Sequence, residues 1–479
     1  MESKLPKNWV LSNISELLDV NMGQSPPSSS YNTEGIGIPF MQGKTEFGNL
    51  YPKIRKYTTD PKKIVQPKTV LLSVRAPIGP TNVSQTELCI GRGLAGISSD
   101  ILPLNFLLYY LRYIEDILDA KGTGTTFKAI SKDKLLETNF PLPPLAEQQR
   151  IVAKLDTLFG SLDALKIRLN NIPQLIKNFK QAVLTQAVTG KLTQEWRVGK
   201  ELEDYSDKQL NDLRNKEGEF ENINLLKSGR RKQKIQSFTW NGLNKIGWAQ
   251  VNIESAAIFI IDCLHNTPKF ELKGEYVIDT TCISPFKIHW EKARKINQEY
   301  FEKWVNRLAP KNGDILFSRE GTIGIGIKVP KEKKICIGQR MMLFRFGSYI
   351  LPEFSEIYMN SMVFRDEFRP HIKGVAAQHL NIGDIRKLNF PIPSKEEQTE
   401  IVKRVENLFS KADAIEKQYK TLKEKIDRLP QAILAKAFKG ELVAQLPTDG
   451  DAKDLLEEIK KLKESLVVKP KKKVVRNKK

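Results

Sequence analysis

The feature that most constrains this 479-residue chain is an internal repeat. Residues 139–192 and 389–442 align without a gap at a constant offset of 250. Identical residues stand at matching places: Pro141 and Pro391, Glu147 and Glu397, Gln148 and Gln398, Phe159 and Phe409, Gly190 and Gly440. Because chance does not produce so long an ungapped match, the sequence predicts two copies of one structural unit related by a pseudo-two-fold axis.

A fainter repeat precedes each copy. Trp9 matches Trp248 at an offset of 239, and Ile90 matches Ile337 at an offset of 247. The offset therefore grows only within these preceding segments. This pattern predicts two domains of similar fold that have diverged in length, each followed by a segment of fixed length.

The fixed segments have the pattern of long helices. Apolar residues alternate at spacings of four and three, which is the heptad pattern of a coiled coil. Because each copy has one apolar stripe that needs a partner, we expect the two helices to pair with each other. The two-fold relation that equal repeats favour makes this pair antiparallel. A core helix within an ordinary globular domain is the alternative interpretation. The predicted seam consists of Ile151, Leu155, Leu158, Leu162, Leu165, Leu169, Ile172 and Ile176 in the first helix and Ile401, Val405, Leu408, Ala412, Ile415, Tyr419, Leu422 and Ile426 in the second.

Two prolines interrupt these predicted helices. Pro173 and Pro430 fall at different phases of the two copies. Since proline removes a backbone donor and clashes with the preceding turn, we expect each to kink its helix or to split it in two.

Each preceding domain mixes strands and helices. Short β-like runs at 70–74 and 314–318 lead into glycine-containing turns, and apolar helical patterns follow at 103–119 and 352–369. The predicted fold class is therefore α+β, with two similar α+β domains separated by two long helices that form an antiparallel coiled coil. The expected segments are a first domain 1–143, a helix 144–192, a linker 193–242 with some helix around 200–216, a second domain 243–393, a helix 394–442, and a short helix with a basic tail 443–479.

The charge balance favours a polyanionic partner. Lys and Arg number 77 against 56 Asp and Glu, giving a net charge of +21. Six lysines and one arginine lie in residues 466–479, and the rest of the chain is still basic. A nucleic acid fits this excess, although a solvated basic surface would give the same count.

Composition also limits the compartment and the chemistry. Residues 1–10 lack an apolar signal region, and the run 101–111 is too short for a membrane span, so we expect a cytoplasmic chain. The cysteines form no C-x-x-C pair, which predicts reduced structural thiols and no metal site. Lys44 follows Gly43 as in a phosphate-binding loop, but Ile38 stands where that motif needs glycine. No set of residues in the sequence has the types and spacing of a catalytic site, so the sequence predicts a non-enzymatic chain.

The doubled junction carries a family resemblance. Pro-x-Pro-x-x-x-Glu-Gln-x-x-Ile-Val occurs at 141–152 and again at 391–402, each time after a domain with Ile-Gly turns and before a heptad helix. This arrangement resembles the specificity subunit of type I restriction-modification systems. The resemblance implies two DNA target-recognition domains that each read one half of a split double-stranded DNA sequence, with the helices spanning the unread bases between them.

The resemblance also implies partners. Two modification (methyltransferase) subunits would dock on the helices and supply S-adenosylmethionine chemistry, while restriction subunits, where present, would add ATP- and Mg-dependent translocation and cleavage. No cofactor is expected in this chain. Ser394-Lys395 replaces Pro144-Leu145 of the first copy, which predicts unequal partner sites. A coiled-coil assembly scaffold without sequence-specific DNA readout is the competing interpretation.

Glycine-punctuated turns are the predicted reading elements, because glycine lets the backbone approach phosphate while neighbouring side chains reach base edges. A surface side chain or an internal salt bridge is the alternative at each position. The candidates are Gln42, Lys44, Arg75, Arg92, Lys121, Thr125 and Thr126 in the first domain and His265, Thr267, Lys269, Arg319, Glu320, Arg340, Lys373, Gln378 and His379 in the second.

Overall fold

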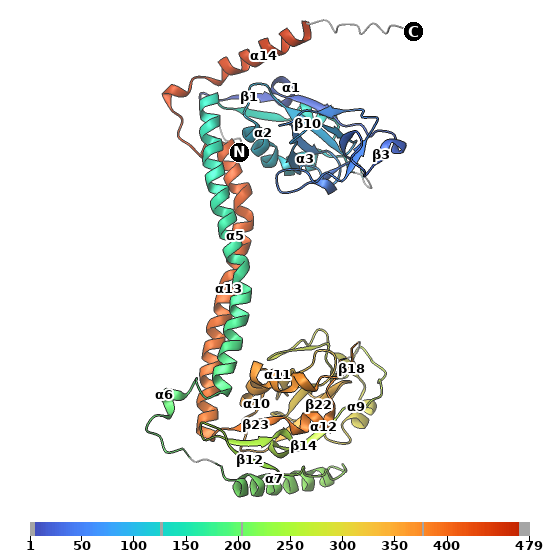
Figure 1. The fold of residues 1–479 in the computed structure, drawn as a ribbon, viewed down its shortest axis with the longest axis vertical. Coiled ribbons are helices and arrows are strands. Elements are labelled where there is room, and N and C mark those ends of the chain that lie inside the picture. The colour runs from blue at the N-terminus through green and yellow to red at the C-terminus, as the bar shows by residue number, and fades with distance from the viewer. Residues whose placement is uncertain (1–4, 125–127, 203–204, 376–377, 469–479) are drawn as a thin grey trace. The chain divides into compact units, whose positions relative to one another are not determined.

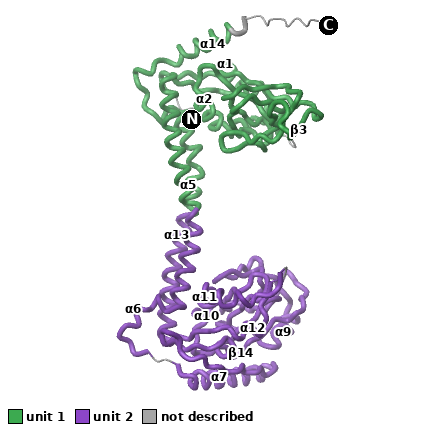
Figure 2. Tube along the Cα trace, in the orientation of Figure 1, with its two compact units in different colours: residues 1–170, 420–479 green, residues 171–419 purple. Residues whose placement is uncertain are grey.

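The computed structural model describes residues 5–124, 128–202, 205–375 and 378–468 (Figure 1). The chain divides into two compact units (Figure 2). Unit 1 comprises residues 1–170 and 420–479, and unit 2 comprises residues 171–419. The basic tail predicted at the C-terminus lies, from residue 469 onward, outside the described residues.

Unit 1 is built from two sheets and a small strand pair. The first sheet has the order β2-β10-β7-β8, and all its neighbours are antiparallel. The second has the order β3-β5-β4-β9-β6, in which β4 and β9 are parallel. The strands are β1 Val10–Asn13, β2 Asp19–Met22, β3 Tyr31–Asn32, β4 Ile38–Met41, β5 Lys56–Thr58, β6 Ile64–Val65, β7 Val70–Ser73, β8 Thr81–Val83, β9 Leu88–Ile90, β10 Leu94–Ser98 and β11 Asn139–Leu142.

Unit 2 repeats this arrangement. Its first sheet, β14-β22-β19-β20, has the same antiparallel order, and its second, β18-β15-β21, again contains one parallel pair, β15 with β21. The strands are β12 Trp240–Leu243, β13 Ala249–Asn252, β14 Ala257–Asp262, β15 Glu275–Ile278, β16 Ile283–Ser284, β17 Lys287–Ile288, β18 Arg294–Ile296, β19 Ile315–Ser318, β20 Gly326–Lys328, β21 Ile335–Ile337, β22 Met341–Phe346 and β23 Asn389–Ile392.

Both units also contain helices shorter than the two predicted long helices. The helical patterns expected at 103–119 and 352–369 are each divided into two helices. The helices are α1 Ile14–Leu17, α2 Leu104–Tyr113, α3 Glu115–Lys121, α4 Lys132–Leu136 and α14 Ala452–Val468 in unit 1, and α6 Gln194–Arg197, α7 Asp207–Lys227, α8 Ile253–Ala256, α9 Gln298–Trp304, α10 Pro352–Met359, α11 Met362–Phe368 and α12 Ile382–Lys387 in unit 2.

The strand that enters each long helix pairs in the same register in both units. In unit 1, Val10 lies opposite Leu142 at the junction of β1 with β11. In unit 2, Ala249 lies opposite Ile392 at the junction of β13 with β23. The α+β fold and its internal repeat, both predicted from the sequence, are therefore confirmed.

The two long helices are α5, Leu145–Val188, and α13, Lys395–Phe438, each 44 residues long. Each runs on through its proline, Pro173 or Pro430, so the expectation that proline could split the helices is wrong. Proline removes a single backbone donor, and the packing of the long apolar face on the partner helix offsets this loss.

The helices pack antiparallel, as the two units show separately. In unit 1, the beginning of α5 shares a core with the end of α13, through Leu155 and Leu434. In unit 2, the end of α5 shares a core with the beginning of α13, through Leu184 and Val405. The antiparallel coil predicted from the heptads is thus present.

The predicted seam is not uniformly buried. The exposed fraction of the seam side chains varies along each helix, and the pattern is similar on both. A single partner helix covers only the centre of a stripe this wide. At the flank, Leu165 keeps 47% of its surface exposed, against 4% for Leu162. The buried positions are Ile151, Leu155, Leu162, Leu169, Ile176, Ile401, Val405, Ala412 and Ile426; Leu158, Ile172, Leu408 and Tyr419 are half-buried; and Leu165, Ile415 and Leu422 are exposed.

The linker, in which some helix was expected around 200–216, contains helix α7, which extends further to Lys227. Helix α7 begins with a capping box, in which Ser206 and Gln209 satisfy each other's backbone N–H groups, and it packs on β14. Helix α14 is the counterpart of α7 in the chain order, because it follows the end of α13 as α7 follows the end of α5. It packs on α1 in unit 1 (Figure 1). Among the described helices, none combines the length and the apolar character needed to cross a membrane.

Candidate nucleic-acid interface

In unit 1, loops from different strand ends are joined into one surface, which we call rim 1. It comprises residues 23–27, 42–46, 74–79, 91–93, 121–124 and 128–130. Gly91 N donates to Met41 O at 2.7 Å, Val74 N donates to Gly93 O at 2.9 Å, and Ile130 N donates to Val74 O at 3.0 Å. These backbone bonds hold the loops in fixed relative positions.

Unit 2 has an equivalent surface, rim 2, at residues 263–269, 279–282, 319–324, 338–340, 372–375 and 378–380. Gly338 N donates to Ile278 O at 2.7 Å, Arg319 N donates to Arg340 O at 3.0 Å, and Leu380 N donates to Arg319 O at 2.8 Å. Each bond has its counterpart in rim 1 at the matching place of the repeat. The two rims therefore share one backbone framework.

The backbone requires glycine at Gly79 in rim 1 and at the matching Gly324 in rim 2. Gly79 has φ +109° and Gly324 has φ +89°, both in the left-handed region that side chains disfavour. A Cβ at these positions would also collide with Glu115 and with Phe368, respectively. The Ile-Gly turns singled out in the sequence thus fix the loop that follows β7 or β19.

In rim 1, several predicted reading residues lie together. Gln42, Lys44, Arg75 and Arg92 are all exposed. The Gln42 side chain is fixed by Ser25, whose hydroxyl accepts from Nε2 at 2.9 Å.

The remaining candidates of the first domain are Lys121, Thr125 and Thr126. Lys121 donates from Nζ to Thr138 Oγ1 at 2.8 Å, so it ties α3 to the chain ahead of β11. Thr125 and Thr126 lie outside the described residues.

In rim 2, Arg319 differs from the role expected of it. It is only 8% exposed, and it pairs with two carboxylates, Asp262 at 3.1 Å and Glu320 at 2.8 Å. A guanidinium this buried and paired with two carboxylates is less suited to contact a base edge than the exposed candidates of rim 2. Arg319 instead orients Glu320, which is half-buried beside the exposed Arg340 at 3.7 Å.

The other rim 2 candidates are more open. The His265 side chain is 70% exposed, and its Nε2 lies 3.0 Å from Asp262 Oδ2. Thr267 accepts from Gln339 Nε2 at 2.8 Å.

Three more candidates, Lys269, Lys373 and Gln378, are exposed, with Lys373 Nζ 3.4 Å from Asp384. His379 is half-buried, and its backbone exchanges two bonds of 2.9 Å with Lys373. The structure therefore brings the second-domain candidates together on one face.

Sequence reasoning missed residues that the strand register places at the rims. Phe40 pairs with Lys56 in unit 1, and Val277 pairs with Arg294 in unit 2. Both pairs stand one residue before the end of β4 or β15, which leads directly into a rim. The only trace of these two residues in the sequence was a basic side chain, Lys56 or Arg294, in a strand that the sequence did not predict, β5 or β18.

Two arrangements of catalytic residue types in rim 2 and its surroundings do not make a catalytic or metal site. Asp262, Cys263 and His265 place ligand atoms within 4.8 Å of one another, but Asp262 already pairs with Arg319, and burial raises the pKa of the Cys263 thiol, which opposes the thiolate a metal needs.

Ser284 and His289 lie 2.9 Å apart beside Glu291 at 3.4 Å. This row has the residue types of a hydrolytic triad. The Glu291 side chain, however, is 69% exposed, unlike the buried acid that orients a catalytic histidine. We assign the row to the β16–β17 hairpin.

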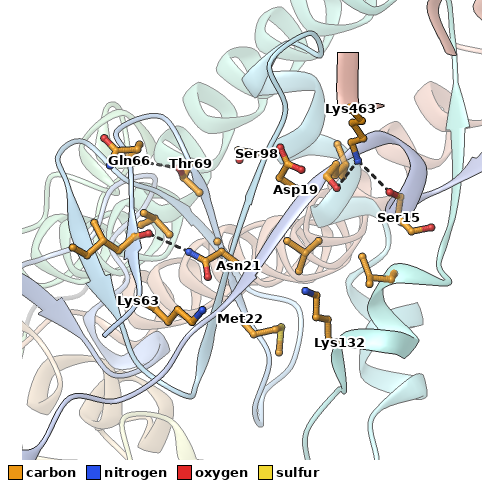
Figure 3. A pocket seen from close by; sticks show the side chains of 16 residues that line it. Ser15, Asp19, Asn21, Met22, Lys63, Gln66, Thr69, Ser98, Lys132 and Lys463 are labelled. Carbon is orange, nitrogen blue, oxygen red and sulfur yellow. Dashed lines mark hydrogen bonds between the residues drawn. The ribbon is translucent and has the colours of Figure 1, made fainter. Parts of the chain in front are cut away.

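A cavity of about 710 Å³ opens along β2 in unit 1 (Figure 3). Lys463 of α14 closes one side, donating from Nζ to the carbonyls of Ser15 at 3.1 Å and Leu18 at 3.0 Å. Burial lowers the pKa of Lys463. None of the candidate reading residues lines this cavity, so we assign its Lys463 wall to the anchoring of α14.

A duplicated α+β chain with two matching rims of polar and basic loops has the architecture of a nucleic-acid recognition protein. The family model described as "Type I restriction modification DNA specificity domain" matches residues 6–174 and 265–424, more than half of the chain. The chain therefore belongs to the family of type I restriction-modification DNA specificity subunits. It is a specificity component and not itself an enzyme.

Individual relatives agree with this assignment. The chain is 29% identical over 466 residues to the type I restriction enzyme EcoBI specificity subunit of Escherichia coli, covering 95% of this chain and 92% of that one. It is 42% identical over 193 residues to the putative type I restriction enzyme MjaX specificity subunit of Methanocaldococcus jannaschii, covering 40% of this chain and 44% of the relative, less than half its length.

Among solved structures, the HsdS subunit from Thermoanaerobacter tengcongensis is 47% identical, with a TM-score of 0.33. The match covers 35% of this chain and 41% of that chain.

Proposed function

We propose that the two rims read the two halves of a bipartite double-stranded DNA target. The observation that carries this proposal is that one backbone framework presents different side chains. At equivalent positions, Arg75 of rim 1 is replaced by Glu320, and Arg92 is replaced by Gln339. Fixed scaffolds with exchanged side chains are what two readers of different base sequences require.

The net charge of +21 supports DNA as the partner, because phosphate neutralisation supplies much of the affinity of such proteins. The reading domains comprise residues 1–143 and 243–393, and the chain works where its DNA is, in the cytoplasm. In this proposal the segments 144–192 and 394–442, which contain α5 and α13, correspond to the base pairs that are not read.

The helices also dock the partner subunits in this proposal. Exposed apolar side chains occur on both helices, including Leu165 and Phe179 on α5 and Ile415 and Leu422 on α13. Exposed apolar stripes of this kind are typical of protein–protein contacts. Two modification subunits would bind there and hold S-adenosylmethionine, and restriction subunits, where present, would hold ATP and Mg.

The test is a domain exchange read out by the methylated DNA motif. Residues 9–138 are replaced by the corresponding domain of another family member, and the chain is expressed with its own modification subunit. Sequencing of methylated adenines should show one changed half-site and one unchanged half-site. If both halves change, each domain does not read independently.

A scaffold without sequence readout makes a different prediction. The exchange would then leave the methylated motif unaltered, and the affinity of the assembled complex for DNA would be the same for target and non-target duplexes. Affinity that falls with rising salt, together with a preference for the target, supports the proposal.

A further inference from the structure

Arg294 occupies a built position beside rim 2. It is the first residue of β18, and its backbone pairs with Val277 near the end of β15. The chain leaves β15 at Ile278 and enters rim 2 at Asp279. The register therefore places the Arg294 side chain at the end of the sheet where the rim loops gather.

Two side chains hold the Arg294 guanidinium. Its Nη2 donates to Asp279 Oδ2 at 2.7 Å, and its Cζ lies 3.8 Å from the centroid of the Phe270 ring. An aromatic face and a carboxylate together restrict both the plane and the rotation of the group.

Asp279 is itself fixed. It accepts from Thr281 N at 2.9 Å and from Thr281 Oγ1 at 2.6 Å. Burial alone would raise the pKa of Asp279, but the hydrogen bonds from Thr281 and Arg294 lower it below its ordinary value. The carboxylate stays charged at neutral pH and keeps its hold on Arg294.

The Arg294 guanidinium is held in place and still has N–H donors that Asp279 does not engage. Its side chain remains 52% exposed, and a guanidinium has five N–H donors, of which Asp279 engages one. Two parallel donors from arginine match the O6 and N7 acceptors of guanine in the major groove. A long side chain that only neutralised phosphate would not need its plane fixed.

We propose that Arg294 reads a guanine in the DNA half-site recognised by the second domain. This inference rests on the proposed function. In unit 1 the same register position holds Lys56, opposite Phe40. Lysine lacks the planar fork, so the two domains differ at this position in what they discriminate.

The test uses the specificity chain assembled with its modification subunits. Arg294→Ala and Arg294→Lys are compared with the unaltered chain by sequencing methylated sites and by measuring Kd for duplexes changed one base pair at a time. Discrimination at a single G·C pair of the second half-site should fall by about 5- to 150-fold, with all other positions retained. Arg294→Lys should lose this discrimination while keeping the salt dependence of binding.

Lys303→Ala is the matched control. Lys303 is also an exposed cation in the second domain, paired with Glu299 at 2.7 Å one turn away on α9. Its loss should leave every position of the motif unchanged.

Two results would overturn the inference. One is a uniform loss of affinity with all base preferences intact, which would make Arg294 a phosphate contact. The other is an unaltered motif in both variants. If the unaltered complex itself shows no base preference in the second half-site, the proposed function fails instead, and the two failures are thereby distinguished. Arg294→Lys keeps the charge beside Asp279, so it reports even if Arg294→Ala does not fold.

Discussion

The indole Nε1 of Trp9 donates a hydrogen bond to Oε2 of Glu147 at 3.0 Å. Trp248 repeats this contact with Glu397 at 2.8 Å. Both glutamates are fully buried, near the first turn of α5 or α13. The Glu of the repeated Glu-Gln motif therefore fastens each domain to its long helix, and its negative charge suits a helix N-terminus.

Glu147 and Glu397 differ in their other hydrogen-bond and ion-pair partners. Glu397 also accepts from Thr193 at 2.6 Å and pairs with Arg197, whereas Glu147 accepts from Gln445 at 3.0 Å. Glu397→Ala leaves a mostly buried guanidinium without its carboxylate, which typically costs about 3 kcal/mol, and Glu147→Ala should cost about 2 kcal/mol. Native-state hydrogen exchange, followed separately in residues 5–170 and 171–419, measures each loss.

Glu396→Ala is the control for this pair, because Glu396 is exposed on the same turn. It should change the protection of neither unit. Equal losses for Glu147→Ala and Glu397→Ala would contradict the extra contribution of Arg197.

The glutamines of the motif are also unequal. Gln398 Nε2 donates to Pro393 O and Tyr349 O, each at 2.9 Å, and its Oε1 accepts from Leu351 N at 2.7 Å. Gln148 Nε2 donates to Pro143 O at 2.9 Å, and its buried Oε1 has no hydrogen-bond partner among the described residues.

At about 1 kcal/mol for each net hydrogen bond, Gln398→Ala should lower the unfolding free energy by about 2 kcal/mol more than Gln148→Ala. Urea titration with a fluorescence readout compares the two variants. A larger effect at Gln148 would mean that its carbonyl oxygen has a partner the structure does not show.

The coil makes a prediction about neighbouring positions of one stripe. Leu162 is 4% exposed and Leu165 is 47% exposed. Leu162→Asp buries an unpaired charge and should cost more than 3 kcal/mol, so that soluble chain is lost. Leu165→Asp should leave the chain folded, because its carboxylate reaches water.

The same Leu165→Asp variant tests the proposed docking of partners. Size-exclusion chromatography with the modification subunit should show a folded specificity chain that assembles poorly. Normal assembly and normal methylation by this variant would remove Leu165 from the docking surface.

The proposed spacing role of the helices can be tested by lengthening both. Seven residues are inserted after Asn170 in α5 and after Lys420 in α13, at matching places of the repeat. One heptad keeps the stripe in phase and adds ~10 Å at ~1.5 Å per residue. At ~3.4 Å per base pair, the methylated motif should keep both half-sites and gain roughly three unread pairs.

Insertion into α5 alone is the control for this experiment, since it puts the two stripes out of register and should abolish methylation. A doubly extended, active chain that methylates its original motif would show that the coil does not set the spacing.

Cysteine reactivity reports on the packing of unit 2. All four cysteines are free and buried, and burial raises the pKa of Cys336 to about 12. At pH 8 such a thiol is ~0.01% thiolate, against about a quarter for an exposed thiol. Alkylation of Cys336 followed by mass spectrometry should therefore be negligible until denaturant opens the unit.

Ser161→Cys, at an exposed position of α5, provides the reactive comparison in the same chain. Fast modification of Cys336 in native buffer would mean that β21 opens locally.

The sequence alone determined the repeat, the α+β class, the antiparallel coil and the family. These features depend on periodicity and on residues matched across long distances, such as Trp9 with Trp248, and both are visible in one dimension. The loops that carry the candidate residues were predicted in part: the turns marked by Gly79 and Gly324 lie at the rims, because a left-handed backbone leaves a signature in residue type.

Only the tertiary structure decided which side of an apolar stripe the partner helix buries and which charged side chains form salt bridges. Leu162 and Leu165 have the same residue type in the same pattern, and their different exposure depends on the path of one partner helix. Arg319 forms ion pairs with Asp262 and Glu320, while Arg294 is placed beside rim 2 because its strand pairs with β15. Such pairings join residues far apart in the chain through space, and a single sequence does not contain their geometry.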